Sequence, residues 1–392
     1  MNDLTIIKKF DKVTEELNCG VNISIINLID QLIEKAHASR ASDIHIDPLA
    51  KSVRIRFRID GVLQDIYSFP KEISNEIISR IKILSRLRTD EHQITQDGRF
   101  RYKVIDFRVS IAPTYHGENA VLRLLASKNE EAKLEDLGFS ASDKKKIENA
   151  LRKTNGMILS TGPTGSGKTT TMYTLIKMLN SPSVSIVTIE DPIEYAIDDI
   201  EQIQVNARAG LTFANGLRSI LRQDPNIIMV GEIRDAETAN IAVNTALTGH
   251  LLLSTLHTSD AATTLPRLLD MGIEEYLVAS TVSIAIGQRL VRKICQHCKE
   301  KTIVNKKLTY KGKGCEECNG SGYRDRICIN EVLVADNKIR EAILRRASAS
   351  EIKKIAIKNG MTTMFEDGLQ KVKAGLTKRQ SAEIKISWRM RA

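Results

Sequence analysis

One segment of the chain orders glycines, a lysine and a hydroxyl residue as a phosphate-binding loop requires. Residues 162–169 read Gly-Pro-Thr-Gly-Ser-Gly-Lys-Thr and fit the pattern G-x-x-x-x-G-K-[ST] in full. The glycines let backbone N–H groups converge on phosphate oxygens without an obstructing Cβ. Lys168 can place its charge on the β- and γ-phosphates, and Thr169 can offer its hydroxyl to Mg²⁺. The predicted nucleotide contacts are Gly162, Pro163, Thr164, Gly165, Ser166, Gly167, Lys168, Thr169 and Thr170.

The residues on either side of this loop agree with the assignment. The apolar run Met157–Ser160 is typical of a buried strand, and Lys168–Leu179 favours a helix. A helix that starts at Lys168 would aim the positive end of its dipole at the bound anion. A structural glycine-rich turn is the competing interpretation, and the strand–loop–helix setting argues against it.

A carboxylate for the attacking water is predicted after a second apolar strand. Ile227–Val230 is followed by Gly231 and Glu232. Glu232 could hold or polarise the water, directly or through Mg²⁺-bound water. A solvent-exposed glutamate after a core strand would give the same pattern, but the phosphate loop upstream favours the catalytic role.

Two more polar segments adjoin apolar strands. Glu190 and Asp191 follow the strand 184–189, and ligands gather at the carboxyl ends of strands in open α/β sheets. Both could therefore face the nucleotide, with Glu190 assisting catalysis, although an acidic turn fits equally well. His250 and His257 flank a further apolar strand, which suggests that they sense the γ-phosphate by donating hydrogen bonds, and we name His257 as the catalytic candidate.

The cysteines indicate a metal site. Four of the six form two C-x-x-C pairs: Cys295 with Cys298, and Cys315 with Cys318. This spacing is typical of zinc, because each turn directs two thiolates at one ion and four thiolates leave no position open for chemistry. We therefore predict a structural zinc ion, with a disulfide pair or an iron–sulfur cluster as alternatives. Cys19 and Cys328 lack such spacing and are interpreted as ordinary thiols.

Length and composition describe an ordinary globular chain. It has 392 residues, 42% of them apolar and 27% charged, which leaves room for two or three domains. The net charge of +10 would suit a solvated basic surface or attraction to an acidic partner. No signal peptide and no apolar run of membrane-spanning length is found, so we expect a cytoplasmic protein that could dock on a membrane from inside.

The elements that must position these residues fall into two folded parts. Val53–Ile59 alternates apolar and basic residues, as a half-buried strand does, within a smaller mixed α/β module. Further along, apolar strands alternate with helices, which predicts a mostly parallel sheet covered on both faces. The predicted parts are an N-terminal tail 1–21, the smaller α/β module 22–126, a linker 127–136 and an α/β domain 137–392 that includes a zinc module 293–320 and a helical C-terminal region 336–392.

Further motifs occur in a fixed order along the chain. Besides the phosphate loop and the cysteines they are Ala41–His45, Arg56–Leu63, Gln96–Arg99, Arg108–Ser110, Thr188–Glu194, Leu221–Asp235, Gly249–Thr258 and Gln288–Arg292. With these motifs the chain resembles the secretion ATPase superfamily, specifically the type II secretion and type IV pilus assembly ATPases. The segments that start at 188, 221 and 249 resemble the aspartate box, the Walker B motif and the histidine box of that family.

The resemblance implies a RecA-like core that hydrolyses ATP with Mg²⁺ in a homohexamer, with each active site between subunits. Arg99, Arg108 and Arg123 match by position the family's arginines that reach the nucleotide, where they would neutralise developing charge. Solvated strand faces are the alternative role for these arginines. The resemblance also implies an inner-membrane platform protein as partner and a peripheral location at the inner face of the cell membrane.

Three features refine the resemblance. The four cysteines are typical of assembly and secretion members and absent from retraction motors, which favours pilus extension or secretion. Many members bind a membrane-docking partner through an additional N-terminal domain that the first twenty residues cannot replace, so the docking partner stays open. His92–Thr95 stands where relatives more often carry a basic residue and proline. These features do not show whether the chain serves a pilus, a secretion pseudopilus or a competence pilus.

Two other classes of protein share part of this pattern. A RecA-like nucleic-acid motor would use a basic surface and a zinc module, but aromatic residues make up only 4% of the chain and leave few stacking platforms. We therefore expect no nucleic-acid partner. A scaffold that binds nucleotide with little turnover would not need the complete set Lys168, Thr169 and Glu232.

Overall fold

The computed structural model describes residue 13 and residues 24–125, 133–304 and 307–378. The chain divides into two compact units. The first comprises residues 1–129 with the segments 295–298 and 312–325, and the second comprises the remainder. The predicted tail, including Cys19, lies outside the described residues except for Val13. Residues 127–132 of the predicted linker and residues 379–392 of the predicted C-terminal region also lie outside them.

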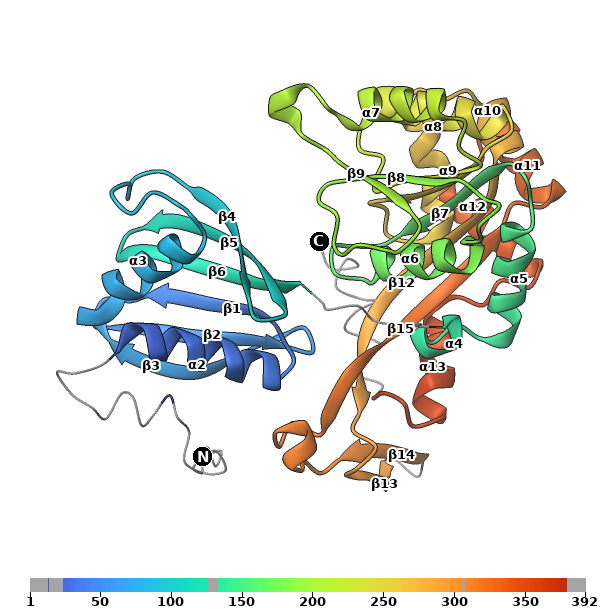
Figure 1. The fold of residues 1–392 in the computed structure, drawn as a ribbon. Coiled ribbons are helices and arrows are strands. Elements are labelled where there is room, and N and C mark those ends of the chain that lie inside the picture. The colour runs from blue at the N-terminus through green and yellow to red at the C-terminus, as the bar shows by residue number, and fades with distance from the viewer. Residues whose placement is uncertain (1–12, 14–23, 126–132, 305–306, 379–392) are drawn as a thin grey trace. The chain divides into compact units, whose positions relative to one another are not determined.

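The first unit is built on a six-stranded sheet in the order β3-β2-β1-β6-β5-β4, with antiparallel neighbours. Its strands are β1 (Ala41–Pro48), β2 (Ser52–Ile59), β3 (Val62–Pro70), β4 (Gln96–Tyr102), β5 (Ile105–Thr114) and β6 (Gly117–Leu125). Helices α2 (Ile25–Ala38) and α3 (Ser74–Leu84) share one apolar core with the inward-facing residues of the sheet (Figure 1). The strand predicted at Val53–Ile59 is confirmed as most of β2. Its residues alternate between this core and the outward face, as the period of two dictates.

The second unit contains a seven-stranded sheet in the order β15-β12-β7-β11-β10-β8-β9. Its strands are β7 (Gly156–Thr161), β8 (Ile186–Glu190), β9 (Glu201–Gln204), β10 (Ile227–Val230), β11 (Leu251–Leu256), β12 (Val282–Ile294) and β15 (Tyr323–Val334). Each neighbouring pair from β12 to β9 runs parallel. The predicted α/β class with a mostly parallel sheet is confirmed, whereas the periodicity did not indicate β1, β9, β12 or β15.

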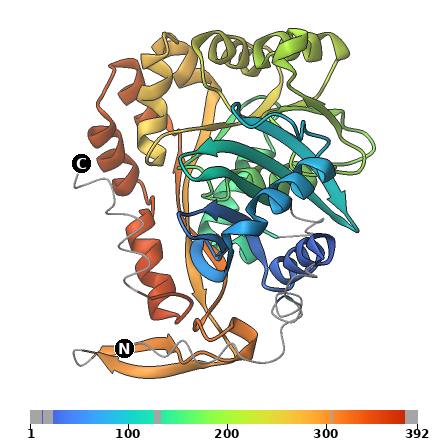
Figure 2. The same cartoon turned by 90° about the vertical axis from the view of Figure 1, so that its left-hand side faces the viewer.

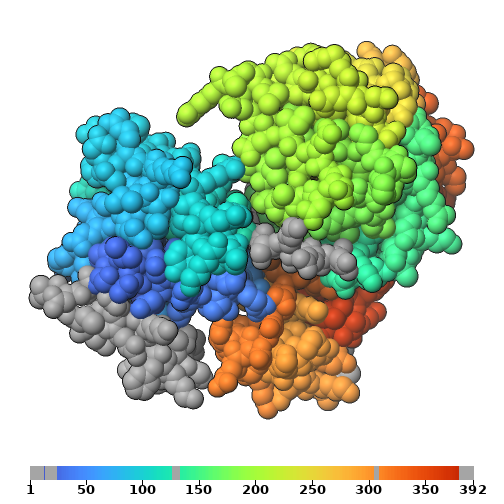
Figure 3. All heavy atoms as spheres, viewed as in Figure 1, coloured from blue at the N-terminus to red at the C-terminus, as the bar shows by residue number. Residues whose placement is uncertain are grey.

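Helices cover both faces of this sheet. They are α4 (Leu134–Leu137), α5 (Ala141–Leu151), α6 (Lys168–Leu179), α7 (Phe213–Ile220), α8 (Ala236–Leu247), α9 (Ala261–Asp270) and α10 (Glu275–Thr281). Met157 and Leu159 of β7 enter the core shared with α7 to α10, while Ile158 enters the core shared with α5 and α6. The segment between β9 and α7, yellow-green in Figure 3, projects from the surface of this unit.

Three short helices and a two-stranded sheet complete the second unit, together with the long strands β12 and β15 of its main sheet. Figure 2 shows β12 and β15 in orange beside the helices in red. The helices are α11 (Asn337–Leu344), α12 (Ala349–Lys358) and α13 (Met364–Lys373), and β13 (Lys299–Val304) pairs with β14 (Lys307–Gly312). The predicted helical C-terminal region is therefore three separate helices over the described residues. No described helix combines the length and the hydropathy needed to cross a bilayer.

Candidate active site and metal centre

The predicted site residues of the second unit gather at one edge of its sheet. Val230 of β10 pairs with Ile189 of β8 on one side and with Ser254 of β11 on the other. Ser254 in turn pairs with Leu159 of β7. Since these strands are parallel and in register, the loops that follow them all leave from the same edge. This edge is the usual ligand-binding place of an open α/β sheet.

The phosphate loop connects β7 to α6. Gly162 and Gly167 have φ angles of 147° and 90°, which residues with a Cβ rarely adopt, and Gly167 precedes the first turn of α6. The ammonium of Lys168 donates to the carbonyl oxygens of Gly162 at 2.9 Å and Pro163 at 3.2 Å. Burial lowers the pKa of Lys168, an effect that the charge of Glu232 partly offsets. Thr169 and Thr170, both half-buried, follow in α6.

A buried glutamine from β12 holds this loop in place. The side-chain amide of Gln288 donates to the carbonyl oxygen of Ser166 at 3.1 Å and accepts from the hydroxyl of Ser160 at 3.2 Å. Gln288 is 1% exposed, so both polar ends are satisfied inside the protein. A Cβ on Gly162 would lie 2.4 Å from the Gln288 carbonyl oxygen. Gln288 was predicted only as part of a family motif, and residue patterns did not indicate this contact.

The loop is also tied to the end of β11. The hydroxyl of Thr161 donates to the carbonyl oxygen of Leu256 at 3.1 Å and accepts from the backbone N–H of Thr258 at 3.0 Å. The phosphate loop and the segment that carries His257 are thereby fixed to each other. Thr258 was named from the sequence only as the end of a family motif, and Thr161 was not named, because a hydroxyl bond between two loops leaves no periodic signal.

Glu232 lies just beyond the end of β10, where both of its carboxylate oxygens have partners. Arg234 donates to Oε1 at 2.5 Å, and Nε2 of His257 lies 2.9 Å from Oε2. The Glu232 side chain is 12% exposed, whereas that of Arg234 is 62% exposed. The structure thus brings the predicted water-activating carboxylate and the predicted γ-phosphate sensor into direct contact.

The two predicted histidines occupy different ends of β11. His250 precedes the strand, where its Nδ1 lies 3.3 Å from the carbonyl oxygen of Thr245. His257 follows the strand and lies at the phosphate-loop edge. Because a six-residue strand spans about 20 Å, the structure brings His257 to this edge and leaves His250 at the other.

Glu190 ends β8 and is enclosed by neighbouring side chains. It is 3% exposed, and its carboxylate accepts hydrogen bonds from Tyr173, from Thr188 at 2.6 Å and from Gln202 at 3.1 Å. Burial, together with the nearby carboxylate, raises the pKa of Tyr173. Glu190 therefore links α6 to β9 through its hydrogen bonds, while Asp191, the next residue, is exposed.

The predicted arginines lie in the first unit, on three adjacent strands. Arg99 of β4 pairs with Arg108 of β5, which pairs with Arg123 of β6. All three side chains are exposed on the outward face. Arg123 also contacts the buried carboxylate of Asp43 at 2.9 Å. Like charges directly across strands repel, so a row of arginines is suited to binding an anion.

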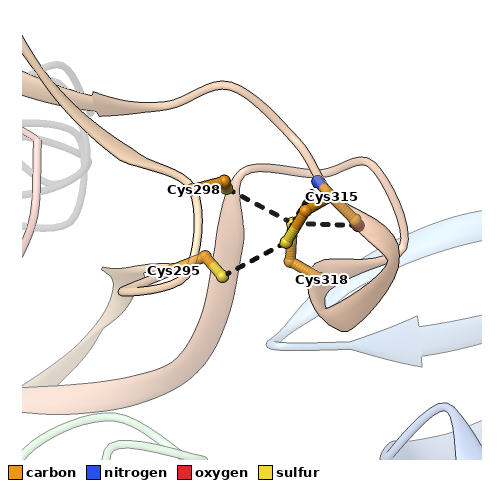
Figure 4. Close-up of side chains that lie close together, drawn as sticks. All are labelled: Cys295, Cys298, Cys315 and Cys318. Carbon is orange, nitrogen blue, oxygen red and sulfur yellow. Dashed lines mark hydrogen bonds between the residues drawn. The ribbon is translucent and has the colours of Figure 1, made fainter.

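The four predicted metal ligands form one compact cluster (Figure 4). Their sulfur atoms all lie within 4.8 Å of one another, with 3.8 Å between Cys295 and Cys315 and 3.8 Å between Cys298 and Cys318. Tetrahedral zinc with Zn–S bonds of about 2.3 Å requires sulfur atoms about 3.8 Å apart. All four are free thiols, which excludes the disulfide interpretation.

Backbone N–H groups surround the cluster as a thiolate site requires. Gly314 donates to the sulfur of Cys298 at 3.3 Å, and Gly322 donates to that of Cys318 at 3.3 Å. The positive φ angles of Gly314 and Gly322, 99° and 73°, turn these groups toward the sulfurs. The donor set therefore fits a structural zinc ion.

The chain as a whole matches known proteins. A family model described as Type II/IV secretion system protein matches residues 21–385. The chain belongs to this family. The family predicted from the motifs is therefore confirmed, and membership makes the chain a nucleotide-binding ATP hydrolase.

Similar proteins come from both branches of the family. The chain is 46% identical to a type IV pilus assembly ATPase, PilB, of Thermus thermophilus over 369 residues, which is 89% of this chain but only 41% of that protein. It is 43% identical to the type II secretion system protein HxcR of Pseudomonas aeruginosa, over 93% of this chain and 78% of that protein. Among solved structures, the pilus retraction motor PilT with bound ADP is 28% identical and superposes with a TM-score of 0.65, covering 91% of this chain and 96% of that one.

Proposed function

We propose that the chain hydrolyses ATP in a Mg²⁺-dependent reaction that powers assembly of a type IV pilus or a type II secretion pseudopilus. The observation that carries the proposal is that Glu232 and His257 lie at the same edge of the sheet as the phosphate loop. A carboxylate for the water and a donor for the γ-phosphate then stand beside the loop that binds the phosphates. The relatives named for pilus assembly and for secretion support both systems equally.

Each residue of this edge has a distinct task in the proposed reaction. The backbone of residues 162–167 and the start of α6 bind the phosphates, and Lys168 turns from the loop carbonyls to the β- and γ-oxygens. Thr169 supplies a hydroxyl to Mg²⁺, which when bound neutralises phosphate charge. Glu232 orients the attacking water, and His257 donates to a γ-phosphate oxygen as charge develops there. Gln288 and Thr161 keep these groups in place.

A ring of subunits would complete the site. Arg99, Arg108 and Arg123 form a cationic row that suits a polyphosphate. We propose that the chain forms a homohexamer in which these arginines reach nucleotide between subunits and neutralise charge in the transition state.

The partner and the location follow from the family. We propose that the chain works in the cytoplasm, at the inner face of the cell membrane, and passes its motion to an inner-membrane platform protein. The zinc ion would hold together the two cysteine turns that follow β12 and precede β15. A structural metal closes a segment that has little apolar core of its own.

The proposed hydrolysis is tested by Glu232→Gln. The amide keeps the size of the side chain but cannot accept a proton or hold the water as a carboxylate does, so turnover should fall by about a hundred-fold or more. Nucleotide affinity, measured by titration with a fluorescent ATP analogue, should remain close to that of the unmodified chain. Unchanged turnover would refute the assignment, and turnover that requires DNA or RNA would favour a nucleic-acid motor instead.

A further inference from the structure

Glu232 has both of its carboxylate oxygens engaged by other side chains in the arrangement that the structure shows. Its oxygen Oε1 accepts from Arg234 at 2.5 Å, and its oxygen Oε2 is 2.9 Å from His257. Each contact takes one of the about four acceptor sites of the carboxylate and, where the partner donates a hydrogen, draws on its negative charge, so Glu232 holds a water less well here than when both oxygens are free. His257 has a place in the proposed reaction, at the γ-phosphate, whereas Arg234 has none so far.

Arg234 has room to leave this contact. Its side chain is 62% exposed, and it lines a hollow of about 260 Å³ together with Asp191, Phe213 and Asp235. Water competes with Glu232 for the exposed guanidinium, which weakens the pairing. A small change in the surroundings can therefore move the guanidinium from one carboxylate to another.

One carboxylate of the hollow is suited to receive the guanidinium. Asp235 is engaged as the cap of α8, where it accepts from the backbone N–H of Thr238 at 2.7 Å and from its hydroxyl at 3.0 Å. Glu237 is engaged with Arg218 at 2.7 Å. Asp191 is exposed and has no hydrogen bond to another described residue. Its negative charge already acts on Arg234 and, after the contact with Glu232, helps to raise the pKa of the guanidinium.

We infer that Arg234 is a latch on the water-activating carboxylate, with Glu232 as its resting partner and Asp191 as its released partner. In the resting position the guanidinium and His257 occupy both oxygens of Glu232. When Arg234 moves to Asp191 and His257 turns to the γ-phosphate, Glu232 is free to hold the water. This inference rests on the proposed hydrolysis. It assigns Arg234 as a positioning residue that limits turnover, rather than as a group that acts on the phosphate.

The loop positions make such a two-way contact possible. Asp191 follows β8 and Arg234 follows β10, and these strands are parallel neighbours in the sheet. Arg234 contacts Glu232, two residues away in the same loop, and lines the same hollow as Asp191, so the proposed movement is a rotation of the Arg234 side chain within that hollow. Glu190, the neighbour of Asp191, is fixed by its three donors, which holds the backbone beside Asp191 in one position.

Four variants of the full chain test the latch by steady-state ATPase kinetics. Arg234→Gln should raise kcat by about two- to five-fold with little change in KM, since only a weak ion pair is removed. Arg234→Lys, which keeps the charge, should stay close to the unmodified chain. Asp191→Asn should lower kcat, because the guanidinium then stays on Glu232. The double variant Arg234→Gln with Asp191→Asn should match Arg234→Gln alone, because no latch remains to be released.

The control is Arg345→Gln, which removes an exposed arginine that pairs with Glu351 far along the chain and should leave kcat unchanged. A fall in kcat for Arg234→Gln, or no change, would overturn the latch. If Asp191→Asn lowered kcat equally in the unmodified chain and in the Arg234→Gln variant, Asp191 would not be the released partner. These failures differ from failure of the proposed hydrolysis, because in each of them the unmodified chain still hydrolyses ATP and Glu232→Gln still abolishes turnover.

Discussion

Nε2 of His257 lies 2.9 Å from a carboxylate oxygen of Glu232, although 25 positions separate the two residues in the sequence. Glu232 follows β10 and His257 follows β11, and the two strands are parallel neighbours. The sheet therefore converts a distant pair into a direct contact. Removal of His257 by His257→Ala should lower kcat by about a hundred-fold with nucleotide affinity kept, as loss of one preorganised donor does.

His250 provides a matched control for that experiment. It flanks the same strand but lies at the opposite end, near the carbonyl oxygen of Thr245. His250→Ala should leave ATP turnover within about two-fold of the unmodified chain, as expected for a side chain outside the site. Equal losses from both variants would contradict the assignment of His257 alone to the phosphate edge.

Alkaline pH should weaken nucleotide binding through Lys168. Burial lowers the pKa of this lysine from its ordinary value of 10.5, with a smaller opposing effect from Glu232. A lysine with a lowered pKa loses its charge at a lower pH, and its buried charge costs stability that is regained as pH rises through that pKa. As pH rises, ATP affinity should therefore start to fall before pH 10.5 is reached, whereas folding stability should not fall.

The measurement is a titration with a fluorescent ATP analogue between pH 7 and pH 10, using the unmodified chain and Lys168→Arg. Arginine stays charged over this range, so its curve should be flat whatever its absolute affinity. A parallel decline in both proteins would place the titrating group elsewhere.

Gln288 should matter for nucleotide binding without touching the nucleotide. Gln288→Ala removes the donor to the Ser166 carbonyl and the acceptor of the Ser160 hydroxyl, leaving buried polar groups unpaired. The expected loss in stability is about 1–3 kcal/mol, and ATP affinity should fall because the phosphate loop is less well held. Thermal unfolding and ATP titration measure the two effects, with the exposed Gln93→Ala as a variant that should change neither.

Zinc should be present at one ion per chain and should depend on the cysteine cluster. Cys298→Ser removes one of four thiolates and should release the metal and lower the thermal stability, because zinc binding is coupled to folding of the turns. Cys328→Ala changes a buried thiol outside the cluster and should keep the full zinc content. Mass spectrometry can measure the zinc content per chain of the unmodified protein and of both variants. A folded unmodified chain without zinc would refute the site.

The arginine row should act between subunits. Arg108→Ala should lower turnover by at least about ten-fold, since arginines at a transferring phosphoryl group contribute strongly to the rate. Arg101→Ala is the matched control, because Arg101 lies on the same sheet and pairs with Asp106 at 2.9 Å. Mixing the impaired Arg108→Ala chain with the Glu232→Gln chain should restore activity, because some mixed interfaces then contain an intact Glu232 and an intact Arg108. Without restoration, a role across the interface is excluded.

Several features could be predicted from local sequence alone. The phosphate loop was predictable because its glycines and lysine are contiguous, and α6 was predicted with the bounds that the structure has. Strands β7, β10 and β11 were predictable because buried parallel strands read as continuous apolar runs. Strand β9 was not, because its four residues lie at an edge and are mostly polar.

The sequence by itself determined the identity of the chemical groups: the phosphate loop, the acidic end of β10 and the spacing of four cysteines. Their types and neighbours along the chain are enough to name the family and the α/β class. Tertiary structure alone decided which groups meet. It placed His257 against Glu232, enclosed Glu190 among three donors, put Gln288 against the phosphate loop and set Arg234 on Glu232. These contacts depend on strand order and register, which long-range pairing fixes and local residue patterns do not encode.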